Sequence, residues 1–538
     1  MNKNILVAFL IAFIILFTYP KYLKMISHPS AEKQVIQLES PEDTEFSPKL
    51  AEDVNMHQEE IFIKDEKMET IENEQLRIVV SNRGAAISSI YLKEYNGGGE
   101  VTLYDVSDAG ETRRDYIGEI RVLDEKGRFI EKYNTLYYNR LDSSRNDEIV
   151  YEAPVIEGLY IKKKIALDAD DYNIKISFFI ENTLEQEREI TVELSSGLVY
   201  EVKRKYDKQY INSVVKSYDK VVVTRINKLI KEGSSLQNKV DWLAIEKKYF
   251  TIILKPFFNA NSARVKHIGK NTLLGYILSE PIKLLRHEAV SLKSIYFAGP
   301  KHYKVLKAYG NNFEDILSRG FFGSIKTFMV IVLSFFYSIF HNYGIAIIVL
   351  TIIIKILFAP LTHKSFESMR KMQELQPQMK ALQEKYKNEP QKLNKEIMGL
   401  YKQHKANPFS GCFPLLLQMP IFIALYQTLS QSVELRGAPF IWWIKDLSEP
   451  DRMFTLPFSL PVIGDSFNFL PLIMLVSMIW QQKLTPSTAT SKEQERIMLL
   501  MPIMFGVIFY NLPSGLVLYW FVNNVLTISH QLIHRKLR

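Results

Sequence analysis

The sequence predicts a membrane α-helical bundle, made of an N-terminal anchor and a five-helix core, together with a large antiparallel β-sandwich domain. Three observations predict this fold class. Apolar runs with almost no charge lie near the N-terminus and through the second half of the 538-residue chain, an acidic stretch follows the first run, and apolar and polar residues alternate between about Leu76 and Phe297. Hydrophobic residues make up 47% of the chain and charged residues 23%, which excludes global disorder.

Residues 1–20 are expected to form an uncleaved transmembrane anchor around the apolar run from Ile5 to Tyr19. A cleaved signal peptide is the alternative because the run is short, but no small-x-small cleavage site follows it. Residues 21–74 are expected to be a disordered linker. Its section 27–74 carries 14 acidic residues against four lysines, so the chain repels itself, and three prolines break any regular element.

Residues 75–318 are expected to form one β-sandwich domain on the far side of the membrane. Segments such as Tyr160–Leu167 and Ile190–Leu194 alternate apolar and polar residues, and turn-forming clusters such as Asn96–Gly99 separate them. Many short alternating strands are typical of an antiparallel sandwich. The domain shows no catalytic constellation; a sandwich of this kind could bind peptide or sugar, but the sequence indicates no site.

Residues 342–538 are expected to form the helical core. Its five expected spans are about Tyr343–Leu361, Phe409–Leu429, Phe467–Gln481, Ile497–Tyr510 and Gly515–Leu532. Residues 319–341 are a rival span, but polar side chains recur there near helical spacing, which favours an amphipathic helix lying in the membrane interface. Residues 365–405 show apolar residues at three-four spacing on both sides of Asn388-Glu389-Pro390, which predicts a cytoplasmic helical hairpin.

The distribution of basic residues predicts the topology. Lysine and arginine concentrate in residues 364–405, in residues 483–496 and in the C-terminal tail. With six spans, all three basic segments and both termini lie in the cytoplasm, as the positive-inside rule requires. The net charge of +8 is therefore mainly a topology signal. Nucleic-acid binding is the weaker alternative, and no direct readout of nucleic acid is expected.

Several kinds of chemistry are excluded or disfavoured by the sequence. The single cysteine, Cys412, excludes an internal disulfide and a multi-cysteine metal site. The chain has no G-x-x-x-x-G-K-[ST] motif and no H-E-x-x-H motif. His530 and His534 stand four residues apart with no glutamate between them, which favours solvated interfacial histidines over a metal site. We therefore expect no catalytic residue, no metal, no cofactor and no nucleotide hydrolysis.

Lys355 is the most informative residue of the core, because it lies inside an otherwise apolar span. A lysine at the centre of a membrane costs about 2.5–3.5 kcal/mol on insertion scales. Snorkelling of its long side chain to the interface is one interpretation. The other is that Lys355 faces a wet interior, together with Thr351 one turn earlier and polar groups of other spans that need partners, namely Gln418, Gln427 and Asn523. No acidic residue lies within the spans to pair with it, which disfavours a proton or ion pump.

Five motifs follow one another in the second half: Pro360–Thr362, Ser368–Pro377, Asn407–Phe422, Ser432–Arg436 and Pro513–Trp520. Over residues 319–538 they closely resemble the YidC/Oxa/Alb membrane protein insertases, and the anchor, linker and β domain resemble the Gram-negative YidC layout. The resemblance implies a non-enzymatic insertase and chaperone of the cell inner membrane. Its clients are nascent membrane proteins, its surroundings are the lipid bilayer, and it works alone or with the Sec translocon, with the β domain in the periplasm.

The resemblance also implies a hydrophilic groove that carries a positive charge. The family usually has an arginine where this chain has Lys355, so the charge is kept but the planar fork for bidentate carboxylate binding is lost. Thr351 and Trp520 match groove positions of the family, and Asn523 is their neighbour. The chain ends in only a short basic tail, so ribosome contact would depend mainly on the loops.

The predicted cytoplasmic hairpin contains three methionines, Met369, Met372 and Met379. They either pack the two helices together or form a flexible surface that receives hydrophobic client segments, and the two interpretations are compatible.

The sequence disfavours two other function classes. A channel or secondary transporter should show inverted repeats and an acidic coupling site, and an intramembrane hydrolase needs a Ser–Lys or Asp–Asp pair in the bundle.

Overall fold

The computed structural model describes residues 65–536, apart from residues 94, 96–98, 110–115, 131, 142–146, 203–204, 218–219, 238, 318–322, 388, 405–412, 461–463 and 486–491. The expected anchor, and the expected linker up to residue 64, lie outside the described residues. The described residues from 65 onward form one unit, which contains a β domain followed by a helical core.

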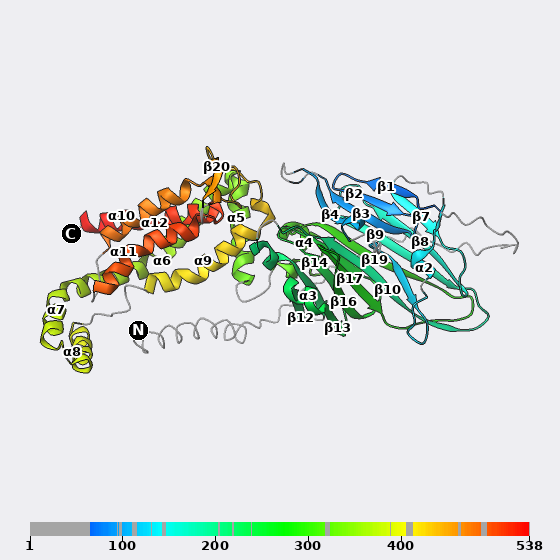
Figure 1. Cartoon of the computed structure of the whole chain (residues 1–538), viewed down its shortest axis with the longest axis horizontal. Coiled ribbons are helices and arrows are strands. Elements are labelled where there is room, and N and C mark those ends of the chain that lie inside the picture. Colours follow the sequence, from blue (N-terminus) through cyan, green and yellow to red (C-terminus); the bar gives the residue numbers. More distant parts are fainter. Residues whose placement is uncertain are drawn as a thin grey trace. The chain divides into compact units, whose positions relative to one another are not determined.

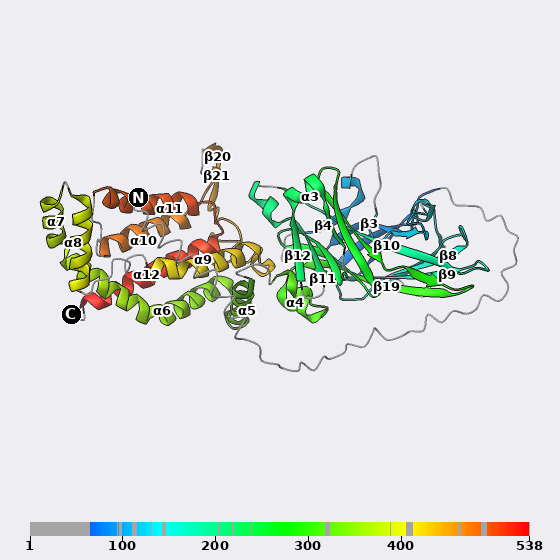
Figure 2. The same ribbon diagram turned by 90° about the horizontal axis from the view of Figure 1, so that it is seen from below.

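The β domain consists of antiparallel sheets (Figures 1 and 2). A four-stranded sheet has the order β1 (Met68–Glu72), β2 (Leu76–Ser81), β3 (Ala86–Leu92) and β4 (Val101–Asp105). A nine-stranded sheet has the order β12 (Lys220–Arg225), β11 (Asn212–Ser217), β14 (Trp242–Glu246), β15 (Phe250–Pro256), β19 (Ala289–Pro300), β9 (Asn173–Asn182), β8 (Leu159–Leu167), β7 (Glu148–Glu152) and β6 (Asn139–Leu141). A six-stranded sheet has the order β13 (Ser234–Gln237), β16 (Ala260–Ile268), β17 (Thr272–Ser279), β10 (Arg188–Val199) and β18 (Ile282–Leu284), with β5 (Ile120–Leu123) paired to β10. Short helices α2 (Lys132–Thr135), α3 (Ile226–Glu232) and α4 (Tyr303–Ala308) accompany the sheets.

The nine-stranded and six-stranded sheets pack face to face, which confirms the predicted β domain. Leu243 and Ile245 of β14 lie over Gly275 of β17, where a Cβ atom would be only 2.5 Å from Cδ2 of Leu243. Glycine is required here because the two sheets approach too closely for a side chain. Strand β8 shows the predicted alternation throughout: every second residue from Leu159 to Leu167 is buried.

The β domain begins earlier than the sequence pattern indicated. Residues 68–72, which were assigned to the disordered linker, form β1 and pair with β2 in the register Ile71↔Ile78. Ile71 is buried in the main core of the domain, while Met68, Thr70 and Glu72 on the opposite face of the strand are exposed. The high acidic content concealed this strand, because Ile71 is the one residue of β1 that enters the apolar core.

The helical core follows the β domain (Figure 1). Its helices and hairpin strands are α5 (Gly323–Phe340), α6 (Tyr343–Glu374), α7 (Gln376–Lys385), α8 (Pro390–Gln403), α9 (Phe413–Gln431), β20 (Phe454–Leu460), β21 (Gly464–Phe467), α10 (Leu470–Leu484), α11 (Lys492–Phe509) and α12 (Ser514–Lys536). Helices α6, α9, α10, α11 and α12 lie side by side, and α7 and α8 lie beyond the end of α6 in both views (Figures 1 and 2). Met329 and Leu333 of α5 are buried in the same apolar cluster as Ile347 of α6 and Leu429 of α9.

Helix α6 is longer than the sequence pattern indicated. It begins at a capping asparagine, since Oδ1 of Asn342 accepts hydrogen bonds from the backbone N–H groups of Gly344 and Ile345. It then passes Leu361, the expected end of the span, and continues to Glu374. Pro360 removes one backbone donor but does not end the helix, and Ser365, Met369 and Met372 are buried along the continuation.

Two helices of the described chain are long and apolar enough to cross a membrane: α6, and Ser514–Ile533 of α12. Three further apolar helices are shorter: Ile325–Phe340, Leu470–Leu484 and Leu499–Phe509.

Candidate substrate groove

Five helices of the core surround a cavity of about 300 Å³. Its lining residues are Ile354, Lys355, Phe358, Leu361, Thr362, Phe366 and Met369 of α6, Gln418 and Ile421 of α9, Met478, Gln481, Gln482 and the following Thr485 of α10, Met501, Pro502 and Phe505 of α11, and Tyr519, Trp520, Asn523, Asn524 and Thr527 of α12. The described lining is largely apolar, carries several amide and hydroxyl groups, and contains no aspartate or glutamate. We call this cavity the groove.

Lys355 is the one cation among the described lining residues, and it donates hydrogen bonds to uncharged side chains. Its Nζ donates a hydrogen bond to Oδ1 of Asn523 at 3.2 Å and another to Oγ1 of Thr527 at 2.6 Å. The Thr527 hydroxyl in turn donates to the backbone carbonyl of Asn523 at 2.6 Å. Both acceptors are uncharged, so the ammonium group is solvated by dipoles while its positive charge is not neutralised by a carboxylate.

Trp520 and Gln418 were both predicted site residues, and the structure places both in the groove lining. Trp520 is largely buried and contacts three rings: Phe422 at 5.2 Å in an edge-on arrangement, Phe505 at 5.9 Å and Phe509 at 5.2 Å. Aromatic packing of this kind fixes the ring and gives the groove a rigid apolar wall.

Nε2 of Gln418 donates to the hydroxyl of Tyr519 at 3.1 Å, which connects α9 to α12 across the groove. The structure therefore brings Lys355, Asn523, Trp520 and Gln418 together in one cavity.

Thr351 and Gln427 were also predicted to face the wet interior, but the structure does not place them in the lining. Thr351 is only 1% exposed, and its hydroxyl donates to the carbonyl of Ile347 in its own helix at 2.6 Å. Gln427 lies on α9, about two turns beyond Gln418, at a half-buried position outside the groove. A polar residue near Lys355 in sequence can thus be satisfied without reaching the cavity.

Two further polar residues connect the wall helices: Asn524, which the sequence predicts to turn inward as a polar group of the last span, and Gln531, which the prediction did not include. Nδ2 of Asn524 donates to Oγ of Ser477 at 2.9 Å, and Nε2 of Gln531 donates to Oγ1 of Thr485 at 3.0 Å. The first bond joins α12 to α10, and the second joins α12 to Thr485, the residue directly after α10. The signal in the sequence for Gln531 is the stripe of polar residues at three-four spacing on α12, from Asn524 through Thr527 to Gln531, which marks one polar face.

The three hairpin methionines are buried. Met372 and Met379 form a small apolar cluster with Leu375 and Tyr401, and the Tyr401 hydroxyl lies 3.3 Å from Sδ of Met379. Met369 is likewise buried and lines the groove. The structure therefore shows the mutual packing of the hairpin, with Met369 directed to the groove.

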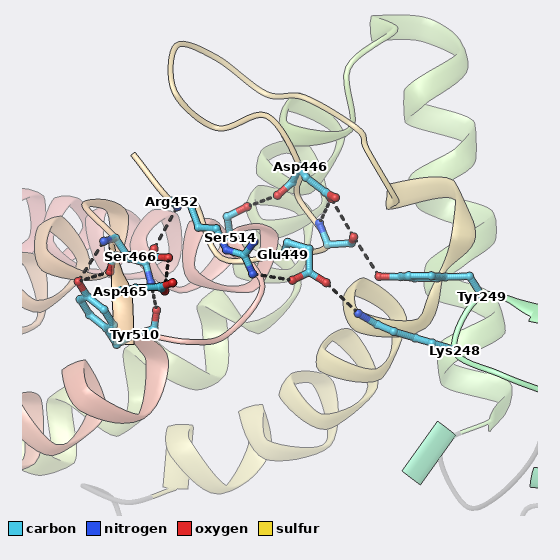
Figure 3. Close-up of polar contacts among 11 residues, drawn as sticks. Lys248, Tyr249, Asp446, Glu449, Arg452, Asp465, Ser466, Tyr510 and Ser514 are labelled. Atoms are coloured by element: carbon cyan, nitrogen blue, oxygen red, sulfur yellow. Dashed lines mark hydrogen bonds and ion pairs between the residues drawn. The ribbon is translucent and has the colours of Figure 1, made fainter. Parts of the chain in front are cut away.

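The first residues of α12 are held by a loop that precedes the β20–β21 hairpin (Figure 3). The N–H of Ser514 donates to the carbonyl of Glu449 at 2.8 Å, and the N–H of Gly515 donates to that of Leu447 at 3.0 Å. The Ser514 hydroxyl donates to the carbonyl of Asp446 at 2.9 Å. The loop thus satisfies donors that a helix leaves unpaired at its start, and it fixes the helix that carries Trp520.

The same loop contacts the turn between β14 and β15 (Figure 3). Nζ of Lys248 forms an ion pair with Oε1 of Glu449 at 3.3 Å, and the Tyr249 hydroxyl donates to Oγ of Ser448 at 3.1 Å. The guanidinium of Arg436 lies 5.7 Å from the centre of the Tyr249 ring. One loop is therefore bonded both to the β domain and to the helix that forms a wall of the groove.

Comparisons with known proteins assign both parts of the chain. Residues 335–538 match the family described as 60Kd inner membrane protein, and residues 69–332 match the YidC periplasmic domain. The chain is 35% identical over 461 residues to the membrane protein insertase YidC of Geotalea daltonii, covering 84% of this chain and 83% of the relative. It is 32% identical over 550 residues to that of Geotalea uraniireducens, covering 99% of this chain and 98% of the relative.

Among solved structures, an active YidC insertase with its first transmembrane domain resolved is similar over 87% of this chain and 93% of that chain. The sequence identity is 19% and the TM-score 0.37. The near-complete coverage by the relative from Geotalea uraniireducens, together with the two domain matches, confirms the resemblance found in the motifs. The chain belongs to the YidC family of membrane protein insertases, of the Gram-negative type with a periplasmic domain.

Proposed function

We propose that this insertase attracts the exported, polar segment of a client membrane protein into the groove through the charge of Lys355. One observation carries the proposal: Lys355 is bonded only to neutral acceptors, Asn523 and Thr527, among the described residues that line the groove. An ammonium group without a permanent counter-ion can bind the carboxylates of a passing segment and release them again. The attraction is that of a point charge, since a lysine lacks the planar fork of arginine.

The energetic role of the groove follows from the cost of moving polar groups through hydrocarbon. Unsatisfied backbone and side-chain groups cost several kcal/mol each in a lipid environment. The amide and hydroxyl groups of Gln418, Gln481, Gln482 and Asn523 offer replacement partners inside the bundle. Burial of the client's own apolar segment in the bilayer then drives the transfer, without a nucleotide.

The basic distribution supports a topology with both termini in the cytoplasm and the β domain in the periplasm. Helices α7 and α8 and the end of α6 carry the largest group of lysines and arginines. In this arrangement the hairpin of α7 and α8 lies where a ribosome delivers a nascent chain, and its basic surface favours contact with ribosomal RNA. Work alone or with the Sec translocon is the corresponding expectation from the family resemblance.

Site-specific photo-crosslinking tests whether a client enters the groove. A photoreactive residue at Asn523 or Gln482 should crosslink to a stalled nascent membrane protein. The matched control is the same residue at Thr351, which is on the helix of Lys355 but buried outside the lining, and it should give no client adduct. Equal crosslinking from all three positions would contradict entry through the groove.

Charge reversal tests the role of Lys355 itself. The variant Lys355→Glu should insert a client with an acidic exported tail several-fold less efficiently, while a client with an uncharged tail should be affected much less. Both clients are assayed with the same purified protein in proteoliposomes, so a folding defect would reduce both equally. Unchanged insertion of the acidic client would refute the proposed attraction.

A further inference from the structure

An exposed group of apolar side chains lies next to the start of α10. Its members come from the loop after α9 and from the first strand of the following hairpin: Ile441, Trp442, Met453, Phe454 and Phe458. We call these five residues the apolar flap. The β20–β21 hairpin that carries part of the flap projects away from the helices (Figures 1 and 2).

Two features of Trp442 carry a free-energy cost in the isolated protein: the exposure of its ring to water and the strain of its backbone. Trp442 is 85% exposed, so the described chain leaves most of a large apolar ring uncovered. Its backbone has φ of +52°, a left-handed conformation that is strained for a bulky residue. The indole stacks on that of Trp443, with ring centres 5.8 Å apart, and Nε1 of Trp443 is fixed by a 2.9 Å bond to Oδ2 of Asp451. The backbone and the neighbouring ring thus hold Trp442 outward.

Hydrogen bonds connect the base of the flap to two helices. Oδ2 of Asp451 accepts from the N–H groups of Phe469 and Leu470, at the start of α10. Nδ2 of Asn468 donates to the carbonyl of Tyr510 at 2.7 Å, and the Tyr510 hydroxyl donates to the carbonyl of Ser466 at 3.1 Å (Figure 3). The flap is therefore fixed in position along the axes of α10 and α11.

This position coincides with one end of the bundle. The carbonyl of Phe440 accepts from Nδ2 of Asn342, the capping residue of α6, so the flap lies at the end where α6 begins and where α5 connects to the periplasmic domain. Exposed apolar residues of α10 and α11 continue from that end, among them Leu472, Val476, Val507 and Ile508. An apolar surface on these helices faces acyl chains, and its periplasmic end is the level at which tryptophan is enriched in membrane proteins.

We propose that the apolar flap is immersed in the outer leaflet of the bilayer, at the boundary between lipid headgroups and acyl chains. Phospholipid is its partner, because the flap continues the lipid-facing surface of α10 and α11 at interfacial depth. The indole of Trp442 is then covered by lipid, and its burial offsets the backbone strain. The flap thereby fixes the depth of the loop that holds the start of α12. This inference does not depend on the charge of Lys355.

Spin-label accessibility in nanodiscs of phosphatidylethanolamine and phosphatidylglycerol tests the proposal. A nitroxide is attached to Trp442→Cys or Phe458→Cys in a Cys412→Ser background, which removes the one native thiol. Lys445→Cys is the matched control, because Lys445 is exposed on the same loop and hydrophilic. The ratio of collisions with oxygen to collisions with a water-soluble nickel chelate should be several-fold higher at the two flap positions than at Lys445.

Two outcomes would overturn the proposal. Equal access of the nickel chelate to Trp442→Cys and Lys445→Cys would place the flap in water. Protection of the flap labels from both reagents would show that protein, such as a second copy of this chain, covers them. Because Trp442 is mostly exposed, its substitution removes little packing, and circular dichroism of each labelled variant checks the fold. A Trp442→Gly variant labelled at Phe458→Cys should show a lower oxygen-to-nickel ratio, since the main lipid contact of the flap is then lost.

Discussion

Nζ of Lys355 on α6 donates a 2.6 Å hydrogen bond to Oγ1 of Thr527 on α12, a residue 172 positions later in the chain. The bond joins two walls of the groove through the cation itself. The Thr527 hydroxyl donates its hydrogen bond to the carbonyl of Asn523, so a lone pair of its oxygen can accept from the lysine. The Thr527 hydroxyl therefore serves as a hydrogen-bond acceptor for the ammonium group of Lys355.

The variant Thr527→Val is expected to lower the thermal stability of the protein, because Lys355 loses its shorter hydrogen bond without losing its charge. A buried polar group left without a partner costs about 1–3 kcal/mol. Thermal unfolding of the full-length protein in detergent measures the effect. Ser529→Ala is the matched control, since Ser529 makes the same bond to a carbonyl four residues earlier but is exposed. Adding Lys355→Met to Thr527→Val should recover stability; a further loss would contradict this pairing.

Substitution at Lys355 should separate charge from hydrogen-bond geometry. Lys355→Arg keeps the charge, and we expect it to retain insertion of clients with acidic exported tails. Lys355→Gln keeps polarity but removes the charge, so insertion of these clients should fall several-fold. Reconstituted insertion with matched amounts of protein is the assay. Equal activity of the two variants would show that polarity alone suffices.

Lys163 of β8 should make the stability of the periplasmic domain depend on pH. It is fully buried, its Nζ donates to the carbonyl of Gly118 at 2.6 Å, and burial lowers the pKa of its ammonium group to about 7. Between that value and the ordinary lysine pKa of about 10.4, the unfolded chain binds more protons than the folded one. Unfolding free energy should therefore rise with pH in this window, by up to about 1.4 kcal/mol per pH unit.

The variant Lys163→Met isolates this contribution. It removes the titrating group, so the difference in unfolding free energy between the two proteins should change in favour of the parent from pH 7 to pH 9. Pulse proteolysis of the full-length protein in detergent measures both proteins at each pH. Because methionine leaves the Gly118 carbonyl without this donor, the variant is less stable overall, and the slope rather than the offset is the readout. Parallel pH profiles would contradict the prediction.

Gly344, near the start of α6, should not tolerate a side chain. A Cβ atom there would be 2.0 Å from Cδ2 of Phe440, so Gly344→Ala is expected to displace the loop that leads to the flap and to lower the melting temperature. Phe440→Ala in the same chain should relieve part of the loss. Gly399→Ala is the contrasting control: its Cβ meets nothing within 4 Å inside α8, so it should stabilise by roughly 0.5–1 kcal/mol. Destabilisation by both alanine variants would refute the steric argument.

The sequence predicted the β domain and the helical core because both depend on periodic patterns that packing preserves. Strand β8 buries every second residue, as its alternation required. Strand β1 was missed because only Ile71 enters the core, and one residue does not make a pattern. The sequence pattern assigned residues 365–374 to the first helix of the hairpin, whereas in the structure they continue α6 through Pro360.

The groove could be predicted in part, since a lysine among apolar residues needs a wet or polar environment. Asn523, Trp520 and Gln418 join Lys355 in the lining. Thr351 does not, because it is buried among the packed helices with its hydroxyl bonded to its own helix, and sequence spacing cannot distinguish this from a hydroxyl that faces a cavity. Thr527 bonds directly to Lys355, a contact that depends on how α6 and α12 cross rather than on spacing within one helix.

The unbroken course of α6 has a mechanical consequence. From Lys355 to Glu374 the helix continues through Pro360 for 19 residues, which at about 1.5 Å per residue is a length of roughly 28 Å. This segment joins the cation to the base of the α7–α8 hairpin, with Met369 lying along it. Because one helix carries both Lys355 and the base of the hairpin, we expect a displacement of the hairpin by an arriving nascent chain to be transmitted to the wall of the groove that carries Lys355.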